Sequence, residues 1–349
     1  MSSRTVSPPI RLRLPFQPPI DLDGLIAFLG RRAVAGVEEI LPAGGYRRSV
    51  RLPRGPGVIE LHPPRKPGYV EAAFRLHDHR DLGAAVQQSR KLLDLDRDPY
   101  TITEVLGDDA VIGPLVRATP GRRVPGHVDP HELALRAVLG QQISVAAATT
   151  HAARIVAAYG GPLDPPVGAV THLFPTTAAV ADADPGALAM PTSRQRTLVT
   201  LAAALATGEL SLDGSADPAL TERDLLALPG IGPWTAAYIA MRVLGDADAF
   251  LPTDLGVRRG LEALGYDGRP VAAVAMAENW RPYRAYAVQH LWAAATAPHP
   301  ARTTTQSPTS TPQSPTTTPQ SPDSTPQSPA STPQSTTTTP QSPALAPHP

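Results

Sequence analysis

The segment LPGIGPWTAAYIA, from Leu228 to Ala240, constrains the fold of this chain more than any other stretch. Two glycines and two prolines interrupt an alanine-rich apolar run, which predicts a sharp turn between two short helices. The backbone N–H groups and the dipole at the start of the second helix favour an anion such as a phosphate. The alternative is a tight corner in which a glycine only ends the first helix.

The pattern changes near residue 120, where TPGRRVPG interrupts the preceding elements. Before it, IRLRLPF alternates apolar and basic residues as a strand does. Strand-like runs then follow a helical DLDGLIAFLGRRAV, and DLGAAVQQSRKLLDL predicts a second helix. After it, alanine-rich amphipathic segments dominate. We therefore expect an α+β domain over residues 10–120 and an all-α domain over residues 121–297.

The last segment, residues 298–349, has a different composition. It holds 14 of the 42 prolines, and a glutamine recurs every seven residues from Gln306 to Gln341. This heptad has no apolar positions that could form a coiled-coil seam. We expect an extended, disordered tail.

Composition excludes several kinds of site. The chain has no cysteine, which rules out disulfides, cysteine-ligated zinc and iron–sulfur clusters. Lys+Arg and Asp+Glu balance at 31 each, so any basic surface must be local. No apolar signal core opens the chain and no run of about 18 apolar residues suggests a membrane span, so we expect a cytoplasmic protein.

The window LPGIGPWTAAYIAMRVLGDADAFLPTDLGVRRGLEALG closely resembles the helix-hairpin-helix DNA glycosylases, and among them the bacterial 3-methyladenine DNA glycosylase II family. RAVLGQQISVAAA, HLFP, RPYRAYAVQHLW and LIAFLGRRAV extend the resemblance over residues 10–297. It implies that the hairpin, with Gly230, Gly232 and Thr235, grips DNA backbone phosphates without reading sequence. A monovalent cation at the hairpin carbonyls is the only cofactor or metal expected.

The resemblance also implies a catalytic carboxylate. Cleavage of an N-glycosidic bond builds positive charge on the sugar, which a nearby carboxylate stabilises. The family places this aspartate after an FLP-type strand end, and AFLPTD supplies Asp254. Asp254 or Thr253 could instead cap the helix that follows, and both roles are compatible. Asp246 and Asp248 are expected to be turn residues.

Aromatic side chains are expected to receive a flipped base, because stacking offsets the cost of extruding it. By family position, Trp234, Tyr238 and Trp292 line the pocket and Phe28 joins them from the first domain. The alternative for each is core packing, the role expected for Trp280. His290 is expected to be a packed helix residue.

Gln142, in LGQQIS, matches the family position whose side chain fills the gap in the duplex; its alternative is a helix-end glutamine. Six arginines are candidate phosphate partners, although arginines are usually solvated surface: Arg122, Arg123, Arg194, Arg196, Arg258 and Arg259.

Together these features predict a monomeric, monofunctional glycosylase that removes alkylated purines from double-stranded DNA. Related bifunctional enzymes use a hairpin lysine, and Trp234 stands at that position here. The two lysines of the chain, Lys66 and Lys91, both precede the helical domain. A glycosylase for oxidised or deaminated purines, and a non-catalytic DNA-binding module, are the alternatives.

Overall fold

The computed structural model describes residues 8–63, 68–184, 190–213 and 217–296. These residues belong to one compact unit, Met1–His299. The predicted disordered tail lies outside the described residues.

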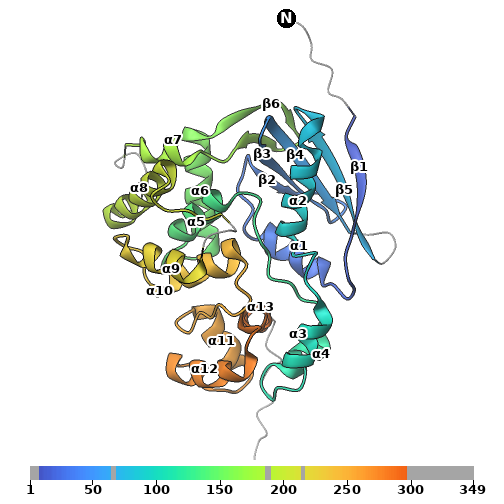
Figure 1. The fold of residues 1–349 in the computed structure, drawn as a ribbon, viewed down its shortest axis with the longest axis vertical. Coiled ribbons are helices and arrows are strands. Elements are labelled where there is room, and N and C mark those ends of the chain that lie inside the picture. The colour runs from blue at the N-terminus through green and yellow to red at the C-terminus, as the bar shows by residue number, and fades with distance from the viewer. Residues whose placement is uncertain (1–7, 64–67, 185–189, 214–216, 297–349) are drawn as a thin grey trace, which may run out of the picture. The chain divides into compact units, whose positions relative to one another are not determined.

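The first part of this unit is an antiparallel five-stranded sheet with strand order β1-β5-β4-β3-β2. Apolar residues of the sheet pack in one cluster with residues of two helices, α1 and α2. Figure 1 shows these two helices beside the sheet. Asp21 caps α1 by accepting a hydrogen bond from the backbone N–H of Gly24. The elements are β1 (Ile10–Pro15), α1 (Leu22–Gly30), β2 (Glu38–Ile40), β3 (Tyr46–Leu52), β4 (Gly55–His62), β5 (Tyr69–Leu76), η1 (His79–Asp81) and α2 (Leu82–Leu92).

The rest of the unit is mainly helical, which confirms the predicted fold class of an α+β part followed by a helical part (Figure 1). Its elements are α3 (Pro99–Leu106), α4 (Gly113–Ala118), α5 (Pro130–Leu139), α6 (Val145–Tyr159), β6 (Gly161–Val167), β7 (Val170–Leu173), α7 (Thr177–Ala181), α8 (Thr192–Thr207), α9 (Pro218–Ala227), α10 (Pro233–Ile239), η3 (Ala240–Leu244, a π-helical turn), α11 (Leu255–Ala263), α12 (Pro270–Ala277), η4 (Glu278–Trp280) and α13 (Arg284–Ala294).

One antiparallel hairpin, β6–β7, interrupts the helical part, where the sequence predicted helices alone. It packs against the β3 side of the large sheet: Ser49 Oγ donates to the carbonyl of His172, and Thr171 N donates to the carbonyl of Gly36. β6 contains three prolines, which suppressed the strand signal in the sequence.

The helices divide between two apolar clusters. The first cluster contains residues from each of the helices α5 through α10. The second contains residues from α3, α4, α11, α12 and α13. Helices α3 and α4 precede the boundary predicted near residue 120, yet they pack with the C-terminal helices and not with the sheet. Tyr238 contacts both helical clusters, and Trp292 contacts the second helical cluster and the sheet cluster. The place where the three cores meet is therefore lined with aromatic side chains.

Candidate active site

Asp254 is the N-cap of α11, and three neutral N–H groups hold its carboxylate. Oδ1 accepts hydrogen bonds from Val257 N at 2.9 Å and from Trp292 Nε1 at 2.7 Å, and Oδ2 accepts one from Trp234 Nε1 at 2.9 Å. The cap predicted as an alternative role is thus present, and the same carboxylate faces an aromatic cavity. No ion pair of Asp254 occurs among the described residues, so its negative charge is available to a ligand.

The four predicted aromatic residues line one cavity of about 520 Å³ together with Asp254. Phe28 and Trp292 stack with ring centroids 6.0 Å apart, and Trp234 and Tyr238 stack at 5.2 Å. The Tyr238 and Trp292 rings are 6.3 Å apart and tilted by 36°. Phe28 comes from α1, while the other three come from α10 and α13. The two parts of the chain thus build this wall jointly.

Gly256, in the first turn of α11, lets Trp292 approach Asp254. A Cβ at this position would lie 2.5 Å from Trp292 Cδ1 and 3.0 Å from Asp254 Oδ1. Only a hydrogen atom fits there, so the indole can donate to the carboxylate. The sequence offered no sign of this, because Trp292 is far from Gly256 along the chain.

Two arginines that the sequence analysis missed lie over the aromatic rings. The guanidinium carbon of Arg32 is 3.7 Å from the Phe28 ring centroid, and that of Arg242 is 5.0 Å from the same centroid. Arg242 Nη1 also donates to the Tyr238 hydroxyl at 2.8 Å. The signal available in the sequence was an arginine inside an otherwise apolar helical run, as in AMRVL.

The arginines perturb one another and Tyr238. Burial, and then the charge of Arg242, lower the pKa of Arg32 to about 10, while Tyr238 opposes this shift. Burial also lowers the pKa of Arg242. For Tyr238, burial would raise the pKa of the phenol, but the nearby charges of Arg242 and Arg32 outweigh it and lower that pKa. Both arginines remain cationic at neutral pH.

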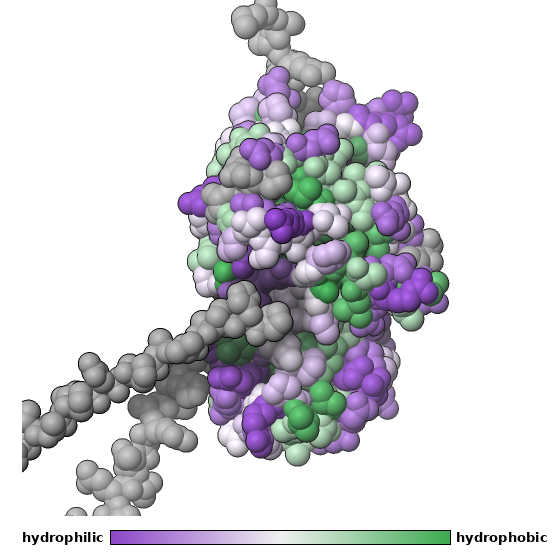
Figure 2. Space-filling model, turned by 90° about the vertical axis from the view of Figure 1, so that its left-hand side faces the viewer, coloured by the Kyte–Doolittle hydropathy of each residue, from purple (hydrophilic) through white to green (hydrophobic). Residues whose placement is uncertain are grey.

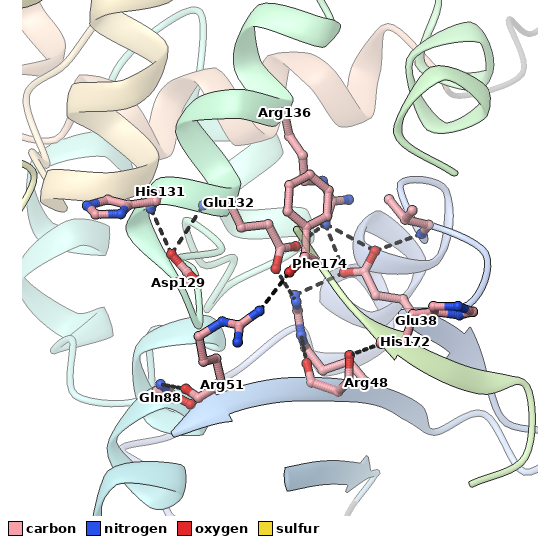
Figure 3. A network of polar contacts seen from close by, with 12 residues as sticks. Glu38, Arg48, Arg51, Gln88, Asp129, His131, Glu132, Arg136, His172 and Phe174 are labelled. Atoms are coloured by element: carbon pink, nitrogen blue, oxygen red, sulfur yellow. Dashed lines mark hydrogen bonds and ion pairs between the residues drawn. The ribbon is translucent and has the colours of Figure 1, made fainter. Parts of the chain in front are cut away.

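The cavity also borders a buried ion network that links the sheet to α5 (Figure 3). Glu38 of β2 and Glu132 of α5 share Arg48 of β3 and Arg136 of α5, at distances from 2.6 to 3.1 Å. Arg136 Nη2 also donates to the carbonyl of Arg32 at 2.5 Å. The network therefore fixes the chain that carries Arg32 relative to the helical part.

The hairpin turn between α9 and α10 has the predicted backbone. Gly230 has φ +85°, and a side chain there would clash with Thr197 Oγ1. Gly232 is the N-cap of α10 and contributes no side chain to that cap. The Thr235 side chain is buried, and its Oγ1 accepts a hydrogen bond from Gln141 Nε2 at 3.0 Å. This side chain braces the turn from inside, and the contact of Thr235 with DNA stays a prediction.

Gln142 lies between α5 and α6 with φ +56°, a conformation that is uncommon outside glycine. Its side chain is exposed. The neighbouring Gln141 donates to Thr235 and to the carbonyl of Gly230, also at 3.0 Å. Gln141 was not predicted, and it couples the turn that carries Gln142 to the hairpin.

Several predicted arginines have internal partners. Arg123 is buried and donates to the carbonyls of Arg97, Gln17 and Pro19, so it cannot reach a phosphate, and that prediction is wrong. The others are placed as follows: Arg122 pairs with Asp21 at 3.1 Å, Arg194 donates to the carbonyl of Gln141 at 2.6 Å, Arg258 pairs with Glu262 at 3.2 Å, and Arg196 and Arg259 are exposed.

Other expected structural residues are packed as predicted. Trp280 and His290 are buried, and burial followed by the charge of Arg122 lowers the pKa of His290 to about 3. Asp246 accepts from Asp248 N, and Asp248 pairs with Arg281 and Arg284. Thr253 is exposed beside Asp254 and makes no cap hydrogen bond.

Within the described ranges, no helix is both long and apolar enough to cross a membrane. In the same part of the chain, no group of three or more His, Asp or Glu side chains could hold a metal ion. Lys91 lies on α2, and burial lowers its pKa, whereas Lys66 falls outside the described residues.

Two families match successive parts of the chain. Residues 11–129 match the AlkA N-terminal domain, and residues 135–285 match the HhH-GPD superfamily base excision DNA repair protein. The chain is 34% identical over 288 residues to DNA-3-methyladenine glycosylase 2 of Escherichia coli, covering 80% of this chain and 95% of that protein.

A second relative is longer than this chain. The chain is 47% identical over 291 residues to the probable bifunctional transcriptional activator/DNA repair enzyme AlkA of Mycobacterium tuberculosis. The match covers 83% of this chain and 58% of that protein. Among solved structures, a 3-methyladenine DNA glycosylase from Archaeoglobus fulgidus has the same fold, with a TM-score of 0.70, 21% identity, and 82% of this chain and 98% of that chain covered.

Proposed function

Because the chain belongs to the HhH-GPD superfamily of base excision DNA repair proteins, in the branch with an AlkA N-terminal domain, we propose that it is a monofunctional DNA glycosylase for alkylated purines. Double-stranded DNA is its partner, and 3-methyladenine and 7-methylguanine are typical substrates. The observation that carries the proposal is the Asp254 carboxylate, held by two indole N–H groups at the wall of an aromatic cavity.

The substrate base enters this cavity by rotating out of the duplex, which costs a few kcal/mol. Stacking on Trp234, Tyr238 or Trp292 offsets that cost by about 1 to 3 kcal/mol per base. A purine methylated at N3 or N7 carries a positive charge, so the aromatic faces add a cation–π attraction. The exposed Gln142 side chain fills the space that the base leaves in the duplex.

The charges of the site favour bond cleavage. As the bond to the sugar breaks, the positive charge moves from the base to the sugar, and the base leaves neutral. Arg32 and Arg242 lie on the aromatic side of the cavity and repel a cationic base but not a neutral one. Asp254 attracts the charge as it develops on the sugar. The leaving base needs no proton, so one carboxylate suffices, and water then adds to the sugar.

The product is an abasic site with both DNA strands intact. Trp234 occupies the hairpin position at which bifunctional relatives carry a lysine nucleophile, and its indole N–H is bound to Asp254. Lys91 is on α2 and does not line the cavity. We also propose that the protein acts as a monomer.

The test is release of free base from alkylated duplex DNA by the wild-type protein and by Asp254→Asn. We expect the variant to lose about 100-fold or more in the single-turnover rate while still binding duplex DNA. Asparagine can keep the cap of α11, so the fold is preserved. Strand breaks should appear only after alkaline treatment.

The same experiment separates the alternatives. Equal release by the wild type and Asp254→Asn would move the active site elsewhere, and no release by either would indicate a non-catalytic DNA-binding module. Release of oxidised or deaminated purines in preference to methylated ones would indicate the other glycosylase class. Breaks before alkaline treatment would contradict the monofunctional assignment.

A further inference from the structure

The wall of the cavity carries a surplus of positive charge, although the whole chain is balanced. Eight arginines and five carboxylates line it, a surplus of three positive charges. A local surplus of positive charge, which composition alone could not locate, therefore lies at the candidate active site. Figure 2 shows the left-hand side of Figure 1, with a recess at mid-height that has both hydrophilic and hydrophobic residues around it.

Most of these arginines are occupied inside the protein. Six have partners already described: Arg48 and Arg136 in the ion network, Arg122 with Asp21, Arg123 with three carbonyls, and Arg32 and Arg242 with the aromatic rings. The remaining two, Arg31 and Arg259, are exposed, and neither side chain has an ion pair or hydrogen bond within the described parts of the chain.

These two arginines come from different parts of the fold. Arg31 is the C-cap residue of α1, three positions after Phe28, and Arg259 lies on α11, five positions after Asp254. Arg31 is close enough to Arg32 and Arg122 to contribute, after burial, to the lowered pKa of both. An exposed cation without a carboxylate partner can bind an anion, and the nearby cations strengthen that attraction at Arg31.

The geometry of a flipped nucleotide supplies that anion. When a base occupies the cavity and its sugar lies at Asp254, the sugar remains joined to a phosphate on each side. Those two phosphates must lie outside the cavity, at its mouth, because the backbone continues into the duplex. Arg31 and Arg259 line this cavity and have exposed side chains, so their guanidinium groups are the candidates for these contacts.

We propose that Arg31 and Arg259 bind the two DNA backbone phosphates that flank the flipped nucleotide, one arginine from each part of the fold. This inference rests on the proposed function, because it requires a nucleotide that enters the cavity. It also assigns the AlkA-type N-terminal part a direct contact with DNA. The arginines hold the sugar against Asp254 and do not take part in bond cleavage.

The test measures binding alone, with a duplex that contains a tetrahydrofuran abasic analogue. The dissociation constant is measured from about 50 to 200 mM salt for the wild type, Arg31→Gln, Arg259→Gln and the double variant. The logarithm of the association constant falls as the logarithm of the salt concentration rises, and each phosphate contact makes this slope steeper by about 0.9. The slope of each single variant should therefore be shallower than that of the wild type by about 0.9, and the slope of the double variant by about twice that. Each should also bind about 10-fold more weakly at low salt.

Two matched controls remove the same charge elsewhere. Arg11→Gln removes another exposed arginine, on β1, which lines a separate depression on the sheet. Arg269→Gln removes an exposed arginine that is paired with Asp267 at 2.7 Å. Both should keep the wild-type slope.

Unchanged slopes in Arg31→Gln and Arg259→Gln, or equal losses in the two controls, would overturn the inference. Because no base release is measured, this result is separate from a failure of the glycosylase proposal. Loss of base release in Asp254→Asn with normal slopes in the arginine variants would support the function and reject these phosphate contacts.

Discussion

Trp292 Nε1 donates a hydrogen bond of 2.7 Å to Oδ1 of Asp254, across 38 positions of sequence. The two residues come from α13 and from the start of α11, which pack closely. The same indole stacks on Phe28 of the first part of the chain. One side chain thus links the candidate catalytic carboxylate to the wall that receives the base.

Replacing Trp292 with phenylalanine should separate these two roles. The smaller ring can still stack on Phe28, but the N–H donor to Asp254 is lost. A hydrogen bond to a charged group contributes about 1.5 to 3 kcal/mol, so we expect the single-turnover rate of base release to fall about 10-fold or more. Trp280→Phe is the matched control, because Trp280 is buried away from the cavity and its indole nitrogen has no hydrogen-bond partner among the described residues. Comparable rate losses in both variants would point to a general effect on folding.

Gly256→Ala should disable the site although Asp254 itself is retained. The new Cβ would lie 2.5 Å from Trp292 Cδ1, so the indole must move away from Asp254. We expect a loss of base release at least as large as in Trp292→Phe, together with a change in tryptophan fluorescence. Gly83→Ala in α2 has nothing within 4 Å of the added carbon and should be silent. Wild-type activity in Gly256→Ala would contradict the proposed role of this contact.

Gln142→Gly should reduce base release more than it reduces stability. The residue has φ +56° and an exposed side chain, so glycine fits the backbone and the free energy of unfolding should change by no more than about 1 kcal/mol. Without the side chain, the gap in the duplex is unfilled and the flipped state is less populated. The rate defect should be large for a lesion in a fully paired duplex and smaller for one opposite a mismatch. Equal defects on both substrates would argue against a wedge.

Glu38→Gln should produce a pH-dependent loss of stability. Burial would raise the pKa of Glu38, but Arg136 and Arg48 beside it hold that pKa below its ordinary value. The contribution of the ionised carboxylate to the free energy of unfolding is therefore present above the unfolded-state pKa, about 4.3, and is lost as the pH falls through the lower folded-state pKa. At pH 7 the variant should be about 3 to 5 kcal/mol less stable, because two buried arginines lose a partner.

Denaturant unfolding of the wild type and Glu38→Gln at pH 7, 5 and 3.5 provides the measurement. The difference between the two proteins should narrow at the acid end, because below pH about 4.3 the unfolded wild type binds a proton at Glu38 that the folded protein does not. A difference of constant size would show that the carboxylate charge is not the source. Base release by the molecules that stay folded should also fall. Without the Glu38 carboxylate, Arg136 is held less firmly, and its hydrogen bond to the carbonyl of Arg32 weakens.

The amino-acid sequence by itself determined most of the elements and their order, but not the β6–β7 hairpin. The alternation in β1 and the helical periodicity of α1 and α2 follow from local chemistry, as does the glycine turn before α10. Asp254 could be identified because a capping aspartate after AFLP is a local feature and because the surrounding motif resembles a known family. Each of these signals depends on neighbours within a few residues, so it can be recognised from the sequence alone.

Tertiary structure alone decided what surrounds that carboxylate. The indole donors, the space at Gly256, the arginines over the rings and the hydrogen bonds of Gln141 all join residues far apart in the chain. The side chains of Thr235 and Arg123 form hydrogen bonds inside the protein, although both residue types are suited to DNA contact. Whether a polar side chain faces solvent or a buried partner depends on which elements pack over it, and no local pattern carries that information.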